Sequence, residues 1–313
     1  MVKDCPTLYF IAGVTASGKS ALAMDWAEKN NAEILSCDSI AIYQGMNIGS
    51  AKPSIHDQSR VQHYGLDLEN VDKRYDISKY LKYAKGVITE AYKRKSRILV
   101  VGGSGFYLRS FFSAVVDEVV VSKDIRKSVE ALYLDEGLTG LLAKLDDLNS
   151  GQLGDLDQAN PVRVIKSLER CLATGLTISE LRKEFEKKPV PYLEFEKKTC
   201  LLDRSDEDLE ILIKNRTETM LMNGLIEETE KLLSDGLQKN YPASSSVGYR
   251  ETISYLRGEI NKSELGHSIR VSTRQLVSKQ RKWFRKYYLT ERLLKPSLDR
   301  ELKAEDLDWN SET

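Results

Sequence analysis

Residues 8–27, LYFIAGVTASGKSALAMDWA, decide the fold of this chain. An apolar run leads into GVTASGKS at residues 13–20, and a helical pattern follows. The motif matches G-x-x-x-x-G-K-[ST] without a mismatch, and strand, loop, helix is the context in which it binds phosphate. The N–H groups of such a loop converge on phosphate oxygens at a helix N-terminus, where the helix dipole also favours an anion. The stretch predicts a site for a di- or triphosphate ester.

Within this loop we expect Lys19 to reach the terminal phosphates and Ser20 to bind Mg²⁺. The motif leaves open which group is transferred. In a kinase or NTPase the phosphoryl group moves, whereas in the other route the diphosphate is a leaving group and the carbon it departs from moves. The predicted diphosphate- or nucleotide-binding residues are Gly13, Val14, Thr15, Ala16, Ser17, Gly18, Lys19 and Ser20.

Four short apolar runs, at residues 8–12, 33–37, 97–101 and 199–202, are typical of buried parallel strands with helices between them. This alternation predicts an α/β fold, a P-loop NTPase-like doubly wound parallel sheet with a helical insertion domain. We expect the first part of the core at 1–111, the insertion at 112–197, and the completion of the core at 198–313. The last 15 residues are acidic and polar, so we expect them to be frayed.

The 313 residues include 47 Lys plus Arg and 47 Asp plus Glu, so the total charge does not indicate a strongly basic nucleic-acid binder. Cys5, Cys37, Cys171 and Cys200 form no C-x-x-C pair and imply no zinc site or disulfide framework. The N-terminus lacks the features of a signal peptide, and no apolar run approaches a membrane span. We expect a reduced, cytoplasmic protein without a membrane partner.

Two further segments follow predicted strands, at the edge where open α/β sheets bind ligands. Asp38 ends the second strand and can hold Mg²⁺, act as a general base, or cap the next helix. The third strand ends in VGGSGFYLRS, residues 101–110, a second glycine loop facing the same pocket. No strand is followed by the catalytic glutamate of a motor-type ATPase.

The balanced total conceals a basic segment at residues 268–289, since no acidic residue occurs from His267 to Tyr288. Arg270, Arg274, Arg281 and Arg285 fall on one stripe of a helix, and we expect Ile269, Leu276, Trp283 and Tyr287 to be buried on another face. A basic stripe suits a phosphate backbone, although a solvated face has the same pattern. Arg250, in SSSVGYRE, is a second candidate cation.

Taken together, these segments resemble the tRNA dimethylallyltransferases, also called tRNA isopentenyltransferases. The resemblance covers roughly residues 7 to 290, and the motifs appear in the family's order: GVTASGKS, CDSIAIYQGMNIGSAKP, VGGSGFYLRS, NPVRVIKSLE, SSVGYRE and TRQLVSKQRKWFRK. The aspartate segment and VGYRE are its most specific parts, since the phosphate loop is widely shared.

The resemblance implies that the loop holds the diphosphate of dimethylallyl diphosphate, with Mg²⁺ bridged through Ser20. The acceptor would be N6 of adenine 37, beside the anticodon of tRNAs that read codons beginning with U, and the product N6-(dimethylallyl)adenosine. By similarity Asp38 takes the proton from N6, Thr15 bonds a phosphate oxygen, and Lys19 and Arg216 complete the catalytic set. We expect a monomer.

The resemblance also implies a surface for the anticodon stem-loop. Its predicted residues are Asp38, Ser39, Ile40, Ala41, Ser104, Val162, Arg163, Val164, Ile165, Lys166, Ser245, Ser246, Val247, Gly248, Tyr249, Arg250, Ser278, Lys279, Gln280, Arg281, Lys282, Trp283, Phe284 and Arg285. The chain departs from the family pattern at Val14, usually proline, at Ser104, usually threonine, at Lys166, usually arginine, and at Ser278, usually lysine. We expect Val14 to affect the stiffness of the loop more than its chemistry, and Ser104 keeps the hydroxyl. The changes at Lys166 and Ser278 should weaken tRNA affinity modestly, and none of the four removes the base, the loop lysine or the metal ligand.

Three other functions fit part of the pattern. An adenylate isopentenyltransferase acting on free AMP, ADP or ATP would share the loop and Asp38 but has little use for the insertion or the arginines. A small-molecule kinase would use the loop and Asp38 equally well, but not the second glycine loop and basic helix. An RNA-binding module that senses NTP is the non-enzymatic alternative.

Overall fold

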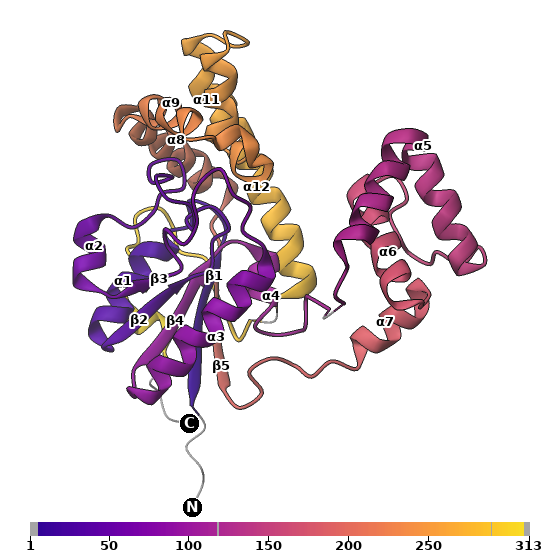
Figure 1. Cartoon of the computed structure of the whole chain (residues 1–313). Coiled ribbons are helices and arrows are strands. Elements are labelled where there is room, and N and C mark those ends of the chain that lie inside the picture. Colours follow the sequence, from indigo (N-terminus) through magenta and orange to yellow (C-terminus); the bar gives the residue numbers. More distant parts are fainter. Residues whose placement is uncertain (1–5, 118, 289, 310–313) are drawn as a thin grey trace, which may run out of the picture. The chain divides into compact units, whose positions relative to one another are not determined.

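The computed structural model describes residues 6–117, 119–288 and 290–309 (Figure 1). Cys5 and the tail after residue 309 lie outside the described residues. The chain forms two compact units. The first runs to Phe112 and resumes at Tyr192, and the second is Ser113–Pro191. The second unit ends ahead of the expected 197 because β5 begins at Glu196 and pairs with β1 in the sheet of the first.

The first unit is built on a six-stranded sheet with the order β3-β2-β4-β1-β5-β6, in which every pairing is parallel. Its strands are β1 (Thr7–Gly13), β2 (Ala32–Ser36), β3 (His63–Tyr64), β4 (Arg97–Gly102), β5 (Glu196–Leu202) and β6 (Arg292–Leu294). The four predicted strands and the α/β class are confirmed. The two strands that were not predicted, β3 and β6, are the short outer strands of the sheet.

Helices cover both faces of the sheet because its strands are apolar on both sides. Leu8 and Phe10 of β1 pack with α3 (Ile77–Lys93) on one face. Tyr9 and Ile11, which point the other way, pack with α1 (Lys19–Lys29). Since the strands are parallel, the loops after β1, β2 and β4 all leave the sheet at one edge.

A group of helices lies at that edge, most of it seen above the sheet in Figure 1, and the last helix of the group runs down beside the sheet. They are α8 (Asp206–Met222), α9 (Leu225–Ser234), α10 (Tyr241–Ser244), α11 (Tyr249–Leu256) and α12 (Lys262–Tyr287). Their apolar faces share a core with residues of the loop after β2, including Ile42 and Met46. Two short helices, α2 (Ile55–Arg60) and α4 (Gly105–Arg109), and the turn η1 (Leu237–Lys239) complete the connections.

The C-terminal segment packs against α1, so the expected frayed end is wrong for the described part. The turn η2 (Ala304–Leu307) brings Leu307 and Trp309 into the core beside Trp26, with the two indole centroids 5.2 Å apart. The Ala304 N–H donates to Asp25 Oδ2 at 2.7 Å, and Lys29 pairs with Glu305 at 3.0 Å. The C-terminal segment is therefore attached to α1 by polar contacts, one of which comes from its acidic residue Glu305.

The second unit contains α5 (Lys123–Asn149), α6 (Pro161–Thr174) and α7 (Ile178–Glu186). It has its own apolar core, which includes Leu141, Val164 and Leu168. Gly137, with φ 67°, interrupts α5 in a conformation that glycine adopts most readily. Across the described parts of both units, no helix is long and apolar enough to cross a membrane.

Candidate active site

The phosphate loop joins β1 to α1 through a tight turn that depends on its glycines. A Cβ on Gly13 would lie 2.7 Å from the Leu202 carbonyl oxygen, and Gly18 has φ +96°. Ala16 is also left-handed, with φ 66°. Buried Arg204 supports the loop from behind, because its Nε donates to the Ser17 carbonyl at 2.9 Å. The N–H groups at the start of α1 remain available for an anion.

Lys19, Asp38 and Arg216 are brought together from β1–α1, the end of β2 and α8. The pKa of Lys19 is lowered to about 8, chiefly by burial and then by the charge of Arg216, with Asp38 opposing both. Burial likewise lowers the pKa of Arg216, again opposed by Asp38. Among the described residues the Arg216 side chain has no ion-pair or hydrogen-bond partner. Two neighbouring cations with one carboxylate form a site that an added anion would stabilise.

Asp38 has one engaged and one free carboxylate oxygen. Its Oδ1 accepts from the N–H groups of Ile40 at 2.8 Å and Ala41 at 3.3 Å, in a turn of the loop after β2. The alternative of a helix cap is wrong, because the next helix, α2, begins only at Ile55. Oδ2 has no hydrogen-bond partner within the described chain. The backbone bonds fix the carboxylate, and the free oxygen can accept a proton.

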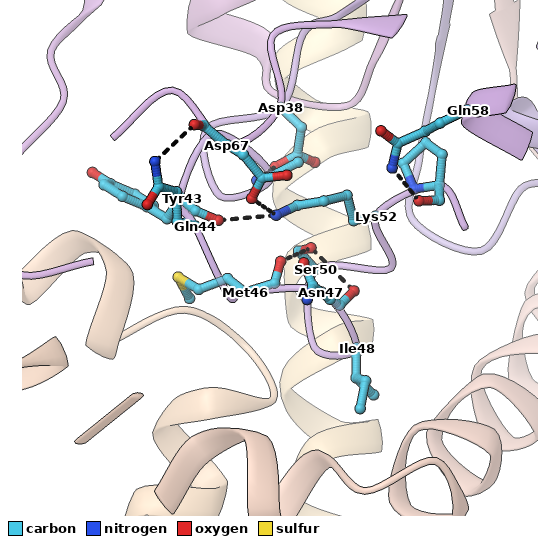
Figure 2. Close-up of polar contacts among 12 residues, drawn as sticks. Asp38, Tyr43, Gln44, Met46, Asn47, Ile48, Ser50, Lys52, Gln58 and Asp67 are labelled. Atoms are coloured by element: carbon cyan, nitrogen blue, oxygen red, sulfur yellow. Dashed lines mark hydrogen bonds and ion pairs between the residues drawn. The ribbon is translucent and has the colours of Figure 1, made fainter. Parts of the chain in front are cut away.

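The loop after β2 is held in shape by its own polar contacts (Figure 2). Lys52, whose side chain is 3% exposed, donates to the Tyr43 carbonyl at 2.9 Å and pairs with Asp67 at 2.6 Å. The Ser50 hydroxyl donates to the Met46 carbonyl at 2.6 Å. Residues 45–53, GMNIGSAKP, therefore form a loop that is held in one conformation by hydrogen bonds to its own backbone.

Glu228 on α9 clamps the same loop, and sequence reasoning missed it. Its carboxylate accepts from the N–H groups of Ile48 at 2.9 Å and Gly49 at 3.2 Å, and from the Tyr249 hydroxyl at 2.6 Å. A Cβ on Gly49 would lie 2.5 Å from the Tyr249 ring. Gly49 and Tyr249 belong to the two segments that resemble the family most specifically, and in the structure they contact each other. No local signal marks Glu228, which lies in an ordinary helix pattern.

Two cavities share Thr15, Lys19, Asp38, Ser50 and Arg216 in their walls. The first, of about 500 Å³, is also lined by residues of α8, α12 and the loop before α11. The second, of about 530 Å³, extends along α1 past Ser20 and α2. The group around Lys19 can therefore be approached from both cavities.

Many of the predicted RNA-contacting residues line the first cavity. Ser104 is held beside the Asp38 loop, because its hydroxyl accepts from the Ser39 N–H at 3.1 Å. The predicted residues found in this wall are Asp38, Ser39, Ile40, Ser104, Ser245, Ser246, Val247, Gly248, Arg250, Lys279, Gln280, Trp283 and Phe284. Ala41 lines the second cavity, and Ser278, Lys282 and Arg285 are exposed on α12. Val162, Arg163, Val164, Ile165 and Lys166 lie on α6 of the second unit.

Burial corrects some of these roles. Val164, Tyr249 and Phe284 are at most 2% exposed and pack in apolar cores, so their side chains support structure instead of offering a surface. Lys166 pairs with buried Glu169 at 2.7 Å. Arg250 donates to Ser272 at 2.9 Å and pairs with Glu251 at 2.5 Å.

The faces of α12 also differ from expectation. Arg274 pairs with Glu210 of α8 at 2.7 Å, and Arg281 pairs with Asp203 at 3.0 Å and with Asp206. The buried stripe is Leu265, Ile269, Thr273, Val277 and Phe284. Of the face expected to be buried, Leu276 and Trp283 line the first cavity and Tyr287 is exposed. Because α12 packs on α8 with one face and lines a cavity with another, its pattern does not show a single buried face.

The residues present fit a magnesium ion held mainly by phosphate oxygens. Nowhere in the described parts do three His, Cys, Asp or Glu side chains gather as a metal site. Mg²⁺ bound with a phosphate ester, however, takes only one or two protein ligands. Exposed Ser20 and Asp38 both line the second cavity, and each has a side-chain oxygen of this kind.

Comparison with known proteins shows the family of this chain. Residues 41–287 match the family model described as IPP transferase. A protein of Opitutus terrae named tRNA dimethylallyltransferase is 43% identical, over 90% of this chain and 91% of its own length. The protein named tRNA dimethylallyltransferase 2 of Geotalea daltonii is 34% identical, over 90% and 85%.

Solved structures with a similar fold come from the same family of enzymes. The tRNA delta(2)-isopentenylpyrophosphate transferase of Staphylococcus epidermidis superposes with a TM-score of 0.66 at 27% identity, covering 97% of this chain and 96% of its own. A eukaryotic dimethylallyltransferase acting on tRNA shares the fold with a TM-score of 0.77 at 23% identity, over 93% and 74%. The phosphate loop, the aspartate and the cavities thus occur in a chain that belongs to the IPP transferase family.

Proposed function

We propose that this protein is a tRNA dimethylallyltransferase, which moves the dimethylallyl group from dimethylallyl diphosphate to N6 of adenine 37 in tRNAs that read codons beginning with U. The observation that carries the proposal is the free Asp38 oxygen beside Lys19 and Arg216, where two cavities meet. One cavity would hold the prenyl donor and the other the acceptor adenine.

The donor side suits a diphosphate. Lys19, Arg216 and the N–H groups at the start of α1 would bind its oxygens, and Ser20 would hold the Mg²⁺ bound with it. When bound, Mg²⁺ supplies charge that stabilises the departing diphosphate. The pKa of Lys19, lowered to about 8, leaves it mostly charged at neutral pH, so it can bind the anion.

The acceptor side suits an amine. An exocyclic N6 is a poor nucleophile, because its lone pair is delocalised into the ring, so a positioned carboxylate is needed. The N6–C1 bond would form as the C1–O bond breaks, one N6 proton would pass to Asp38 Oδ2, and the bonding pair would leave with the diphosphate. Lys19 and Arg216 stand where that charge develops.

The RNA would reach this site through the first cavity. Adenine 37 has to leave its stack to enter, at a cost of a few kcal/mol. Lys279, Arg250 and Ser104 line that cavity and would contact the flipped nucleotide or adjacent phosphates. Exposed Lys282 and Arg285 on α12 would contact the stem-loop backbone. In the second unit, exposed Arg163 on α6 is a candidate for a separate phosphate contact. We also propose that the insertion, which was expected at 112–197 and forms the unit Ser113–Pro191, is a tRNA-contacting domain. We further propose that the protein is a monomer and works in the cytoplasm.

The test is prenyl transfer to a defined RNA. The protein is incubated with Mg²⁺, labelled dimethylallyl diphosphate and an anticodon stem-loop carrying A37, beside the A37→G stem-loop. Label is expected only in the A37 RNA. Asp38→Asn should slow transfer by about 10² to 10⁴, whereas Asp235→Asn, the same change at an exposed carboxylate outside both cavities, should not.

Two further arms separate the other functions. Equal label in free AMP would indicate an adenylate isopentenyltransferase. Phosphate released from ATP, or transferred to a small acceptor, without label in RNA would mean that the loop serves a kinase or an NTPase.

A further inference from the structure

Gln280 on α12 bridges two loops of the donor site. Its Oε1 accepts from the Thr15 N–H at 2.9 Å, and its Nε2 donates to the Gly103 carbonyl at 3.0 Å. One side-chain amide thus ties the phosphate loop to the loop after β4. We call this set of contacts, Gln280 with Thr15 and Gly103, the Gln280 bridge.

The surrounding glycines make room for the bridge. A Cβ on Gly103 would lie 2.7 Å from Gln280 Nε2. A Cβ on Gly105 would lie 2.2 Å from the Trp283 ring, one helical turn further along α12. Neither glycine needs a left-handed backbone, so each is explained by the close approach of α12. The second glycine loop is therefore a seat for this helix.

The bridge also changes how the phosphate loop is used. The Thr15 N–H donates to a side chain 265 residues away, so it is engaged before any diphosphate arrives. The bond fixes the peptide between Val14 and Thr15, next to left-handed Ala16. Any shift of α12 at residue 280 therefore displaces the loop in which Lys19 is held.

The same stretch of α12 faces the proposed acceptor side. Lys279 and Trp283, which flank Gln280, line the first cavity with Ser104 and Arg250. A nucleotide seated on these residues would contact α12 directly beside Gln280, whose amide holds the phosphate loop.

We propose that Gln280 is a positioning residue that couples RNA binding on α12 to donor binding at the phosphate loop. The coupling rests on the proposed function, whereas the positioning of the loop does not. Because linkage is reciprocal, RNA should tighten diphosphate binding by the same factor as diphosphate tightens RNA binding.

The experiment uses the full chain, Mg²⁺ and inorganic pyrophosphate as the probe, with calorimetry as the readout. Affinity is measured alone and with a saturating stem-loop carrying G37, which lacks the acceptor amine. For the wild type we expect the RNA to tighten pyrophosphate binding about fivefold or more. Gln280→Met should weaken pyrophosphate binding about tenfold and abolish the RNA effect.

Two variants make the result specific. Gln62→Met removes a side-chain bond to a backbone carbonyl at an exposed site outside both cavities and should change neither affinity. Gly103→Ala pushes the Gln280 amide away and should reproduce the loss of coupling, and adding Gln280→Met to it should cost nothing more. Thermal unfolding identifies variants that are merely unstable, and Gly103→Ala tests the bridge with Gln280 still present.

The outcomes separate this inference from the proposed function. Wild type that binds RNA and pyrophosphate without coupling, or Gln280→Met that keeps the coupling, overturns the inference and leaves the proposed function standing. Wild type that does not bind the RNA refutes both the proposed function and the coupling. In that case the pyrophosphate affinity of Gln280→Met still decides whether Gln280 positions the loop.

Discussion

The charge on Lys19 should control donor affinity in the pH range just above neutral. Burial and the neighbouring Arg216 charge lower the pKa of Lys19 from 10.5 to about 8, with Asp38 opposing them. The charged form, which binds a diphosphate, is therefore present below pH 8 and is lost as the pH rises through 8. Bound diphosphate raises this pKa, so affinity falls until the pH reaches the pKa of the complex.

The size of the effect follows from the fraction of charged Lys19. With a pKa of about 8, about three quarters of it is charged at pH 7.5 and about 3% at pH 9.5. Pyrophosphate affinity should fall about 25-fold over that interval. Arg216→Gln removes the second-largest cause that lowers the pKa of Lys19. The pyrophosphate affinity of this variant should be lower at neutral pH than that of the wild type, and it should begin to fall only at a higher pH.

Calorimetric titration with Mg²⁺ and pyrophosphate at several pH values is the assay. Lys19→Arg is the matched control because arginine stays charged throughout, so its curve contains only the ionisation of the ligand and of other groups. The difference between wild type and Lys19→Arg isolates the lysine. Parallel curves from pH 7.5 to 9.5 would refute the reasoning, because they would mean that Lys19 keeps an ordinary pKa.

Other changes have distinct expected effects. Glu228→Gln weakens the clamp on the loop and should lower the free energy of unfolding in urea by about 2–4 kcal/mol, and Tyr249→Phe by about 1–2 kcal/mol; unchanged midpoints would contradict the clamp. Gly105→Ala forces the Trp283 ring to move and should raise the KM for stem-loop RNA about tenfold without changing pyrophosphate affinity; loss of pyrophosphate binding instead would place the defect in the donor site. Leu168→Ala should destabilise the second unit by about 2–5 kcal/mol, measured as faster hydrogen exchange in peptides of 113–191 only; equal acceleration in both units would show that they unfold together.

The parts of the fold that sequence could predict are those with dense local signals. The four inner strands are continuous apolar runs, and the phosphate loop has a motif that fixes strand, turn and helix at once. β3 and β6 have two and three residues and lie at the sheet edges, so they contain too few apolar positions to form a pattern. The C-terminal segment looked frayed because its acidic residues, which bind α1, are typical of solvent-exposed chain.

The residues of the candidate site could likewise be predicted only where a local sequence signal marks them. Asp38 could be predicted from its place after a strand, whereas Arg216 followed only from the family resemblance. Glu228 could not be found, and Gln280 was predicted only as an RNA-contacting residue, because the contacts that define their roles join them to residues 180 and 265 positions away. The wheel of α12 separated charge from apolar residues, but it could not tell which arginines would meet Asp203 and Glu210.

The packing of the C-terminal segment on α1 has a consequence for synthesis. The helix that begins at the phosphate loop is covered by Trp309, and Asp25 binds the backbone of a residue made 279 positions later. While the polypeptide is being translated, the apolar side of Trp26 has no cover until that segment emerges from the ribosome. We therefore expect the nascent chain to acquire a stable donor site late and in one step, and ribosome-bound intermediates to expose an aromatic surface to chaperones.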